Sequence, residues 1–400
     1  MELKEVYRLK GIVQHYSWGG YDYIPQLLGQ ANESHQPFAE YWLGAHPNFP
    51  SQIQNGTDLD LGLLIKTDPD GVLGLRVSDK FSSLPYLFKV LDVRQMLSIQ
   101  VHPDKSSAKK GFVNENQKGI PLKASHRNYK DENHKPELMV ALSDFWLLHG
   151  FKKEQDLLQI LNDVHELQFL EKTFKASGYK GIYEEIMLMD QTMVNSILEP
   201  LLKRITPVYE RGELKKEQED FWAARASKTF CQYGQYDRGI FSIYLFNLVH
   251  LEKGQGVFQP EGMPHAYLEG QNVEVMANSD NVLRAGLTEK HIDVEQLLQH
   301  IKFEPTIPEI INPAAKDIRV YGSPVEEFEL IEYNLQTRQI VKIESKTAEI
   351  CLLIDGDLHL SCNEKSLNLQ KGQSIFIIAG SKISVTANLP SQLFRVTIPL

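Results

Sequence analysis

The chain has 400 residues and a formal net charge of −10, from 42 Lys and Arg against 52 Asp and Glu. Its length exceeds what one hydrophobic core usually serves, so we expect two or three domains. The acidic balance argues against nucleic acid or an anionic membrane as a partner, because both need a basic surface, although a local cluster of Lys and Arg can still bind an anionic substrate.

Other bulk features point to the cytoplasm. The first five residues include acidic side chains and lack the apolar stretch of a signal peptide. No apolar run approaches the roughly 18 residues of a membrane span. Cys231, Cys351 and Cys362 are too few and too scattered for a disulfide framework or a zinc site built from cysteines.

Residues 86–149 show the alternation of β-strands. In 97–102 (LSIQVH) apolar and polar residues alternate, and Pro103 is expected to end that strand because it has no N–H to donate. Leu138, Val140 and Leu142 alternate in the same way, which places Glu137 on the opposite face.

From 152 to 233 the period changes to that of helices. Apolar residues recur at i, i+3 and i+4 from Met193 to Ile205, and Glu199 and Lys203 form an i, i+4 pair on the exposed side. Shorter apolar patterns predict one helix before this segment, around residues 157–161, and one after it, around 222–230. We interpret the block as a helical insertion.

Strands are predicted to resume over 239–284, led by the apolar residues Ile240, Phe241, Ile243, Leu245 and Leu248. A short helix is predicted over 291–301, and a proline-rich linker follows. From 325 onward, β-branched runs alternate with turns, which indicates a small all-β domain. The predicted domains are 1–151 with 234–303, the helical insertion 152–233, the linker 304–324 and the β domain 325–400.

One internal repeat is visible. Residues 253–258 (KGQGVF) resemble 371–376 (KGQSIF), and carrying the register forward places Gly262 on Gly380 and His265 on Ile383. Two copies of one β-barrel would explain the match, with a metal ligand only in the first copy. Chance similarity of a short turn-strand unit is the alternative.

Four polar residues form a candidate metal site. Gln100 and His102 lie at i, i+2 on one predicted strand and share a face; Glu137 lies on another strand, and His265 begins a third. Two imidazoles, a carboxylate and an amide oxygen suit zinc or another divalent ion. Alternatively, His102 is a surface residue at a strand end, Glu137 is a solvated charge and His265 caps a turn.

Several stretches resemble type I mannose-6-phosphate isomerase, also called phosphomannose isomerase. They occur in the family's order and span most of residues 7–300, although the C-terminal segment resembles the family only loosely. The runs IQVHPDK and DNVLRAG are highly specific. The matching stretches are 15–19 (HYSWG), 40–47 (EYWLGAHP), 87–91 (LFKVL), 97–105 (LSIQVHPDK), 133–137 (NHKPE), 264–267 (PHAY) and 278–288 (NSDNVLRAGLT).

The resemblance implies a mainly β, cupin (jelly-roll) fold, with a catalytic N-terminal cupin and a second C-terminal cupin-like domain. It also implies a zinc enzyme, with one Zn²⁺ per chain, that interconverts mannose 6-phosphate and fructose 6-phosphate through an enediol(ate). The family's zinc ligands fall on Gln100, His102, Glu137 and His265, and its catalytic arginine falls on Arg284. His15 departs from the family's usual Asn, outside the ligand set.

The remaining roles are less defined. Arginine stays protonated, so Arg284 is expected to stabilise the enediolate or position the opened sugar rather than act as the base. Asp280, His134 and Lys135 are candidates for proton transfer, which the sequence does not rank. The substrate phosphate needs Lys or Arg nearby. Candidate phosphate ligands are Lys89, Lys135 and Lys290. Trp18 is expected either to stack on the sugar or to fill the core.

Three alternatives remain open: an isomerase of another hexose phosphate, a non-catalytic sugar-binding cupin, and a non-haem iron oxygenase. Gln100 argues against the oxygenase, because a fourth protein ligand removes an open coordination position. The expected partner is a small hexose 6-phosphate, with no nucleic acid and no membrane. The sequence does not fix the oligomeric state, although a monomer is plausible.

Overall fold

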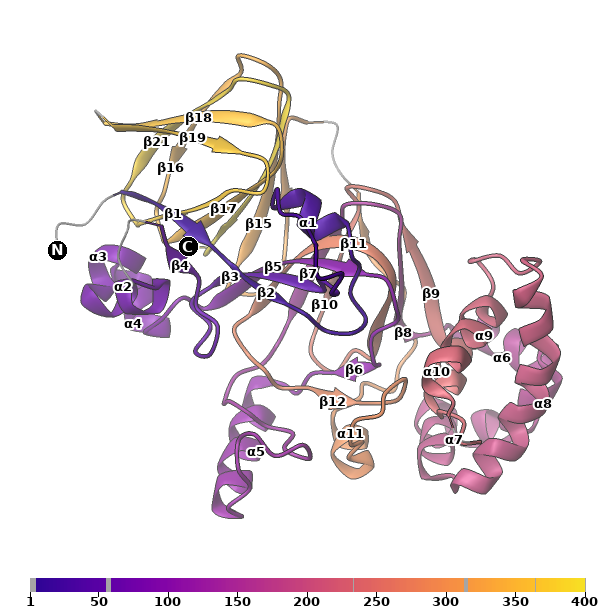
Figure 1. Ribbon diagram of the computed structural model, residues 1–400. Coiled ribbons are helices and arrows are strands. Elements are labelled where there is room, and N and C mark those ends of the chain that lie inside the picture. Colours follow the sequence, from indigo (N-terminus) through magenta and orange to yellow (C-terminus); the bar gives the residue numbers. More distant parts are fainter. Residues whose placement is uncertain (1–4, 55–58, 233, 313–315, 364, 400) are drawn as a thin grey trace.

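The computed structural model of the chain describes residues 5–54, 59–232, 234–312, 316–363 and 365–399. Figure 1 shows two sheet-rich barrels side by side and a lobe of helices that projects from the first barrel. Residues 1–4, on which part of the signal-peptide argument depends, and Pro313 of the expected linker lie outside the described residues. Within these ranges, no helix is both long and apolar enough to cross a membrane.

The first barrel is built on an 11-stranded sheet whose main path runs β13-β10-β7-β11-β5-β3-β2. The remaining strands attach through β11, which also pairs with β6 and β8. The strands are β2 (Ile12–Gln14), β3 (Glu40–Gly44), β5 (Tyr86–Val93), β6 (Gln100–Val101), β7 (Glu137–Ala141), β8 (Phe145–Phe151), β9 (Phe246–Leu251), β10 (Gly256–Gln259), β11 (His265–Ala277), β12 (Leu283–Arg284) and β13 (Ile310–Ile311).

The strand-like pattern predicted over 86–149 is confirmed by β5, β7 and β8 but is interrupted by a helix. The predicted strand at 97–102 shortens to β6, and helix α5 (Lys105–Gln117) follows directly. The Asp104 side chain begins this helix by accepting a hydrogen bond from the Ser107 N–H at 2.9 Å. Only Ala108 and Glu115 of α5 are buried. The helix therefore carries almost no apolar stripe that a periodicity argument could detect.

Residues 239–245 are also helical, which corrects the prediction that strands begin there. Every residue of α10 (Gly239–Leu245) is buried, so its apolar residues surround the helix instead of following one face. A short apolar run that is buried on all sides has no diagnostic period, and a helix then cannot be distinguished from a strand. The chain enters the sheet only at β9.

The helical lobe contains the predicted helices. The predicted amphipathic helix is confirmed as α8. Its buried stripe begins one residue later than predicted, because Met193 is exposed. The buried residues are Val194, Leu198, Leu201, Leu202 and Ile205. The lobe's core is continuous with Val101, Trp146 and Leu148 of the barrel. Its helices are α6 (Glu154–Asp163), η1 (His165–Leu167), α7 (Phe169–Leu188), α8 (Gln191–Glu210) and α9 (Glu219–Phe230).

The second barrel combines a seven-stranded sheet, β14-β15-β22-β17-β20-β1-β4, with a four-stranded sheet, β16-β21-β18-β19. Two of these strands, β1 (Val6–Lys10) and β4 (Gln52–Ile53), come from the start of the chain. The others are β14 (Ile318–Tyr321), β15 (Glu329–Leu335), β16 (Ile340–Glu344), β17 (Glu349–Asp355), β18 (Asp357–Cys362), β19 (Lys365–Gln370), β20 (Ser374–Ile377), β21 (Lys382–Ala387) and β22 (Ser391–Thr397).

The proline-rich segment is more than a linker. Within it β13 pairs with β10 of the first barrel and β14 pairs with β15 of the second. The prolines restrict the backbone to extended conformations, which also suit edge strands.

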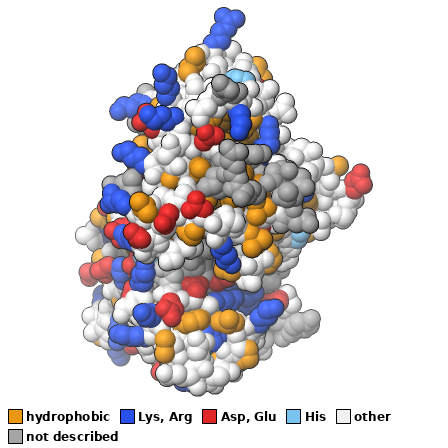
Figure 2. Space-filling model, turned by 90° about the vertical axis from the view of Figure 1, so that its left-hand side faces the viewer, with side chains coloured by type: hydrophobic (Ala, Val, Ile, Leu, Met, Phe, Trp, Pro, Cys, Tyr) orange, Lys and Arg blue, Asp and Glu red, His pale blue; other side chains and the backbone are white. Residues whose placement is uncertain are grey.

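The other helices are α1 (Tyr23–Leu27), α2 (Leu61–Thr67), α3 (Pro69–Leu73), α4 (Leu75–Phe81) and the predicted α11 (Val294–His300). On the face shown in Figure 2, basic and acidic side chains are interspersed.

The internal repeat has a structural counterpart. Gly254 and Gly372 precede β10 and β20 with positive φ angles of 88° and 78°. Gly262 and Gly380 have φ angles of 78° and 81° and precede β11 and β21. Glycine tolerates this conformation because it has no Cβ. The two turn-strand-turn units therefore have the same backbone pattern in the aligned register, which supports a duplicated barrel over chance similarity.

Candidate metal centre

Three buried side chains converge inside the first barrel. His102, Glu137 and His265 each offer a ligand atom, and these atoms all lie within 4.8 Å of one another. The Nε2 atoms of His102 and His265 lie 3.6 and 3.2 Å from the two carboxylate oxygens of Glu137. Two imidazoles and a carboxylate at this spacing can surround one divalent ion.

Strand register brings these residues together. Glu137 is the first residue of β7 and pairs with Met276 on β11 and Gln259 on β10. His265 is the first residue of β11 and pairs with Gln100 on β6. The carbonyl of His102 accepts a hydrogen bond from the N–H of Gly262 at 2.9 Å, which joins β6 to the turn before β11. Three segments far apart in sequence thus meet at one end of the sheet.

Backbone carbonyls fix both imidazoles. Nδ1 of His102 donates to the carbonyl of Asn281 at 2.8 Å, and Nδ1 of His265 donates to the carbonyl of Met263 at 2.9 Å. Each Nε2 is then an unprotonated acceptor, which is the form that binds metals. His102 Nε2 is buried and has no hydrogen-bond partner among the described residues. This orphaned acceptor fits a metal ion.

The electrostatic surroundings keep His102 neutral and Glu137 ionised, which are the protonation states that bind a metal ion. Burial, followed by the positive charge of Lys135, lowers the pKa of His102 to about 4, so the ring is neutral at physiological pH. Burial raises the pKa of Glu137, but the positive charge of Lys135 and the contacts with the two imidazoles outweigh burial and hold that pKa well below its ordinary value. Gln100 lines the same small cavity as Glu137 and His265 and pairs with His265 across β6 and β11, which places this fourth predicted ligand beside the cluster.

Two of the predicted phosphate ligands lie beside this cluster and are already paired. Lys89 Nζ lies 3.2 Å from Glu274 Oε1 and 3.8 Å from Glu40 Oε2, and Lys135 Nζ lies 3.1 Å from Glu137 Oε1. Burial lowers the pKa of Lys89, but the charges of Glu40 and Glu274 outweigh burial and raise it. Both ammonium groups therefore balance buried carboxylates.

A cleft of about 430 Å³ opens next to the metal cluster and contains the predicted catalytic arginine. Gln100, Arg284, Lys290 and Trp18 all line it. Arg284 pairs with Gln100 across β12 and β6. Among the described residues, no carboxylate lies within ion-pair distance of Arg284 or Lys290, and burial lowers the pKa of both groups. Glu40 and Glu289 also line the cleft, but because neither forms an ion pair with Arg284 or Lys290, these two positive groups can bind an anionic part of a ligand.

The other proton-transfer candidates differ in their surroundings. His134 Nε2 lies 2.9 Å from Glu327 of the second barrel, and its Nδ1 lies 3.9 Å from Glu261. Burial lowers the pKa of His134, but these two carboxylates outweigh burial and raise it to about 9. Asp280 lies 3.2 Å from His46 Nε2 and is 38 % exposed. His134 thus belongs to an ionic contact between the barrels, whereas Asp280 remains accessible.

Sequence reasoning missed several residues around the centre. The Tyr267 hydroxyl donates to Glu274 at 2.7 Å, and Glu274 in turn accepts from Lys89. The Trp42 indole N–H donates to Glu40. The alternation along β11 could have identified Glu274. Its side chain faces the interior of the first barrel, whereas its neighbours Val273 and Val275 face the core on the other side of the sheet. No pattern in the sequence marks the backbone carbonyl of Asn281.

The paired barrels and the buried His–Glu–His cluster define a metal-binding cupin. Residues 6–154 match the family model described as phosphomannose isomerase type I, catalytic domain. The chain belongs to the type I phosphomannose isomerase family, and it is therefore an isomerase by class.

Relatives that match nearly the whole chain support this family assignment. Mannose-6-phosphate isomerase of Escherichia coli (strain K12) is 36 % identical over 400 residues, which cover 97 % of this chain and 98 % of that protein. The Homo sapiens protein of the same name is 31 % identical over 429 residues, with 98 % of both chains covered. A Salmonella typhimurium mannose 6-phosphate isomerase bound to its substrate, fructose 6-phosphate, and a zinc atom is 34 % identical, with a TM-score of 0.88 over 99 % of this chain and 100 % of that chain.

Proposed function

We propose that this chain interconverts mannose 6-phosphate and fructose 6-phosphate, using one zinc ion bound by Gln100, His102, Glu137 and His265. The observation that carries the proposal is the buried His102–Glu137–His265 cluster with its orphaned Nε2, next to a cleft with an unpaired arginine. Family membership supplies the reaction, and a zinc-bound, substrate-bound relative supports the metal and the ligand.

Moving the carbonyl between C1 and C2 requires removal of a proton beside that carbonyl, which places negative charge on oxygen. A divalent ion bound at the cluster would supply Lewis acidity toward that charge. In our proposal Arg284 contributes a fixed positive charge from the cleft wall. Its lack of a counter-ion among the described residues supports this role, because a guanidinium already paired with a carboxylate would be less available.

Phosphate recognition is assigned to Lys290. It is exposed on the same cleft wall as Arg284, and no carboxylate in the described parts of the chain pairs with it. Lys89 and Lys135 are nearer to the ligands, where they offset buried carboxylates. For proton transfer we favour Lys135, which lines the small cavity at the cluster, and the accessible Asp280 over His134, which is held between two carboxylates.

We also propose the predicted division of the chain, with the catalytic cupin at 1–151 and 234–303, the helical insertion at 152–233 and the linker at 304–324. Strand pairing crosses these boundaries, because β1, β4 and β14 complete a sheet of the second barrel. The second β domain, 325–400, is proposed to lack a metal site. We place the enzyme in the cytoplasm. The three free cysteines support a reducing compartment.

An assay of the zinc-loaded protein against a panel of aldose 6-phosphates tests the function. We expect the highest kcat/KM with mannose 6-phosphate, and we expect Arg284→Ala to abolish most of the activity. A higher kcat/KM for another aldose phosphate would favour an isomerase of different specificity. Stoichiometric sugar binding without turnover on any aldose phosphate would favour the non-catalytic cupin and contradict the proposal.

A further inference from the structure

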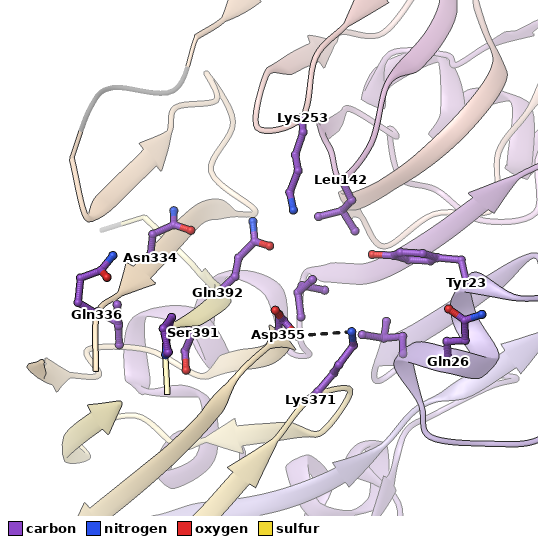
Figure 3. A pocket seen from close by; sticks show the side chains of 14 residues that line it. Tyr23, Gln26, Leu142, Lys253, Asn334, Gln336, Asp355, Lys371, Ser391 and Gln392 are labelled. Carbon is purple, nitrogen blue, oxygen red and sulfur yellow. Dashed lines mark ion pairs between the residues drawn. The ribbon is translucent and has the colours of Figure 1, made fainter. Parts of the chain in front are cut away.

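We propose that a second cleft, located between the two barrels, binds a small hydroxylated anion of the sugar-phosphate type. This inter-barrel cleft has a volume of about 410 Å³, within the range of small-molecule sites, and shares no lining residue with the catalytic cleft. Its walls come from α1, from the turn before β10 in the first barrel, and from β15, β17 and β22 in the second (Figure 3).

Two lysines provide the charge. Lys253 and Lys371 are equivalent positions of the internal repeat, and Figure 3 shows them extending into the cleft from opposite sides. Lys371 Nζ lies 3.5 Å from Asp355 Oδ1, whereas Lys253 has no carboxylate partner among the described residues. Two ammonium groups against one carboxylate leave the cleft with a net positive charge. Two converging like charges repel each other, and an anion between them relieves that repulsion.

Neutral polar side chains provide hydrogen-bonding groups for hydroxyls. The cleft is also lined by Asn334 and Gln392 on one side of the lysines and by Tyr23 and Gln26 on the other. The Nδ2 atom of Asn334 is buried and has no acceptor among the described residues. Gln392 uses its Nε2 on Glu332 at 2.7 Å, which leaves its amide oxygen as an acceptor. Nδ2 is shielded in the observed conformation, so the Asn334 amide would have to rotate to donate to a ligand hydroxyl, and that rotation would pair a donor that is unfavourable when buried and unpaired.

The two lysine-bearing turns are held in place before any ligand arrives. The carbonyl of Gly254, next to Lys253, accepts a hydrogen bond from the Tyr321 hydroxyl of the second barrel at 2.8 Å. Gly372, next to Lys371, has a positive φ of 78°, and a Cβ at this position would lie 1.9 Å from the Leu27 carbonyl oxygen. Each turn is thus anchored against the opposite wall of the cleft. Such pre-organisation reduces the entropy lost on binding.

Equilibrium dialysis of the zinc-loaded full chain with radiolabelled fructose 6-phosphate tests the proposal. We expect about two labelled molecules per chain at saturation, one in each cleft, and about one per chain in the double variant Lys253→Gln with Lys371→Gln. That variant should keep the wild-type kcat and KM, because neither lysine lines the catalytic cleft. A matched control is the double variant Lys342→Gln with Lys346→Gln, which changes two exposed lysines that do not line the inter-barrel cleft. This control protein should still bind two labelled molecules per chain.

Competition identifies the recognised chemistry. Inorganic phosphate should displace the label that the double variant loses, whereas fructose should not, because the lysines select for charge. One labelled molecule per wild-type chain, or two per chain in the double variant, would overturn the second site. Displacement by fructose but not by phosphate would overturn its anionic character. Isomerase activity is a separate readout, so failure of this site leaves the catalytic proposal untouched.

Discussion

His102 donates a hydrogen bond from Nδ1 to the main-chain carbonyl of Asn281 at 2.8 Å. The Asn281 side chain is fully buried, and its Oδ1 accepts from the N–H groups of Lys130 and Asp131. Its Nδ2 donates to the carbonyls of Asp131 and Asn133. One asparagine therefore joins the loop before β7 to the segment that fixes the tautomer of His102, a proposed metal ligand.

Replacing this asparagine should weaken metal binding without removing a ligand. Asn281→Ala breaks the side-chain bonds that hold its own carbonyl in place, and the loss of such an outer partner typically lowers metal affinity about 10–100-fold. Zinc dissociation constants from chelator competition measure the effect. Asn162→Ala on the exposed surface of α6 is the control and should bind zinc like the wild type. An unchanged affinity in folded Asn281→Ala would show that the carbonyl does not depend on this side chain.

The metal should reside in the first barrel alone. Elemental analysis of protein purified without chelator is expected to find about one zinc per chain. His265→Ala should lose both metal and activity, whereas His359→Ala should keep both, because His359 contacts Asn368 on the second barrel at 2.8 Å and has no carboxylate cluster around it in the described chain. Equal damage from the two changes would mean that the metal site is misplaced.

Arg284→Ala should impair turnover while sparing the metal and the fold. Removing a fixed donor that stabilises charge in the transition state typically lowers kcat on the order of 10²–10³. Zinc content, melting temperature, KM and kcat are measured together. A kcat within about threefold of wild type would refute the catalytic role, and a raised KM with unchanged kcat would indicate uniform binding of the substrate.

The apolar stripe of α8 should be essential for stability. Leu198 is 0 % exposed, so Leu198→Asp buries an unpaired charge and is expected to reduce the free energy of unfolding by about 3 kcal/mol or more. Met193→Asp is a matched control on the same helix, because Met193 is 51 % exposed and should tolerate the charge. Urea unfolding of both variants provides the comparison. Equal stability of the two would contradict the packing of α8.

The contact between the barrels should weaken in alkaline solution. The folded pKa of His134 is raised to about 9 by Glu261 and Glu327, above the ordinary value of 6.5. Its contribution to stability is therefore fully present below about pH 6.5 and is lost as pH rises through about 9. The melting temperature of wild type should exceed that of His134→Asn at pH 6.5, and the difference should shrink by pH 9.5. A difference that stays constant over this range would contradict the ionic contact.

The sequence predicted those features that depend on local patterns. The stripe of α8 and the alternation around Glu137 have a clear period, and both elements exist. Helix α10 was misassigned because full burial removes the period, and α5 was missed because it has almost no apolar face. The resemblance predicted four metal ligands, and three of them, His102, Glu137 and His265, lie together in the structure. The partners of Lys89 and the carbonyl that holds His102 depend on strand register and main-chain atoms, which side-chain identities do not encode.

The pairing of β1 with β20 also affects how the protein is made. Val6 pairs with Ile377, so the first strand leaves the ribosome several hundred residues before its hydrogen-bonding partner exists. Until β20 has been synthesised, the edge of β1 that pairs with it stays unpaired, and unpaired strand edges are prone to association with other chains. Cleavage in the proline-rich segment would likewise separate these strands from most of their sheet. The second barrel can therefore assume its full form only when the entire polypeptide has been translated.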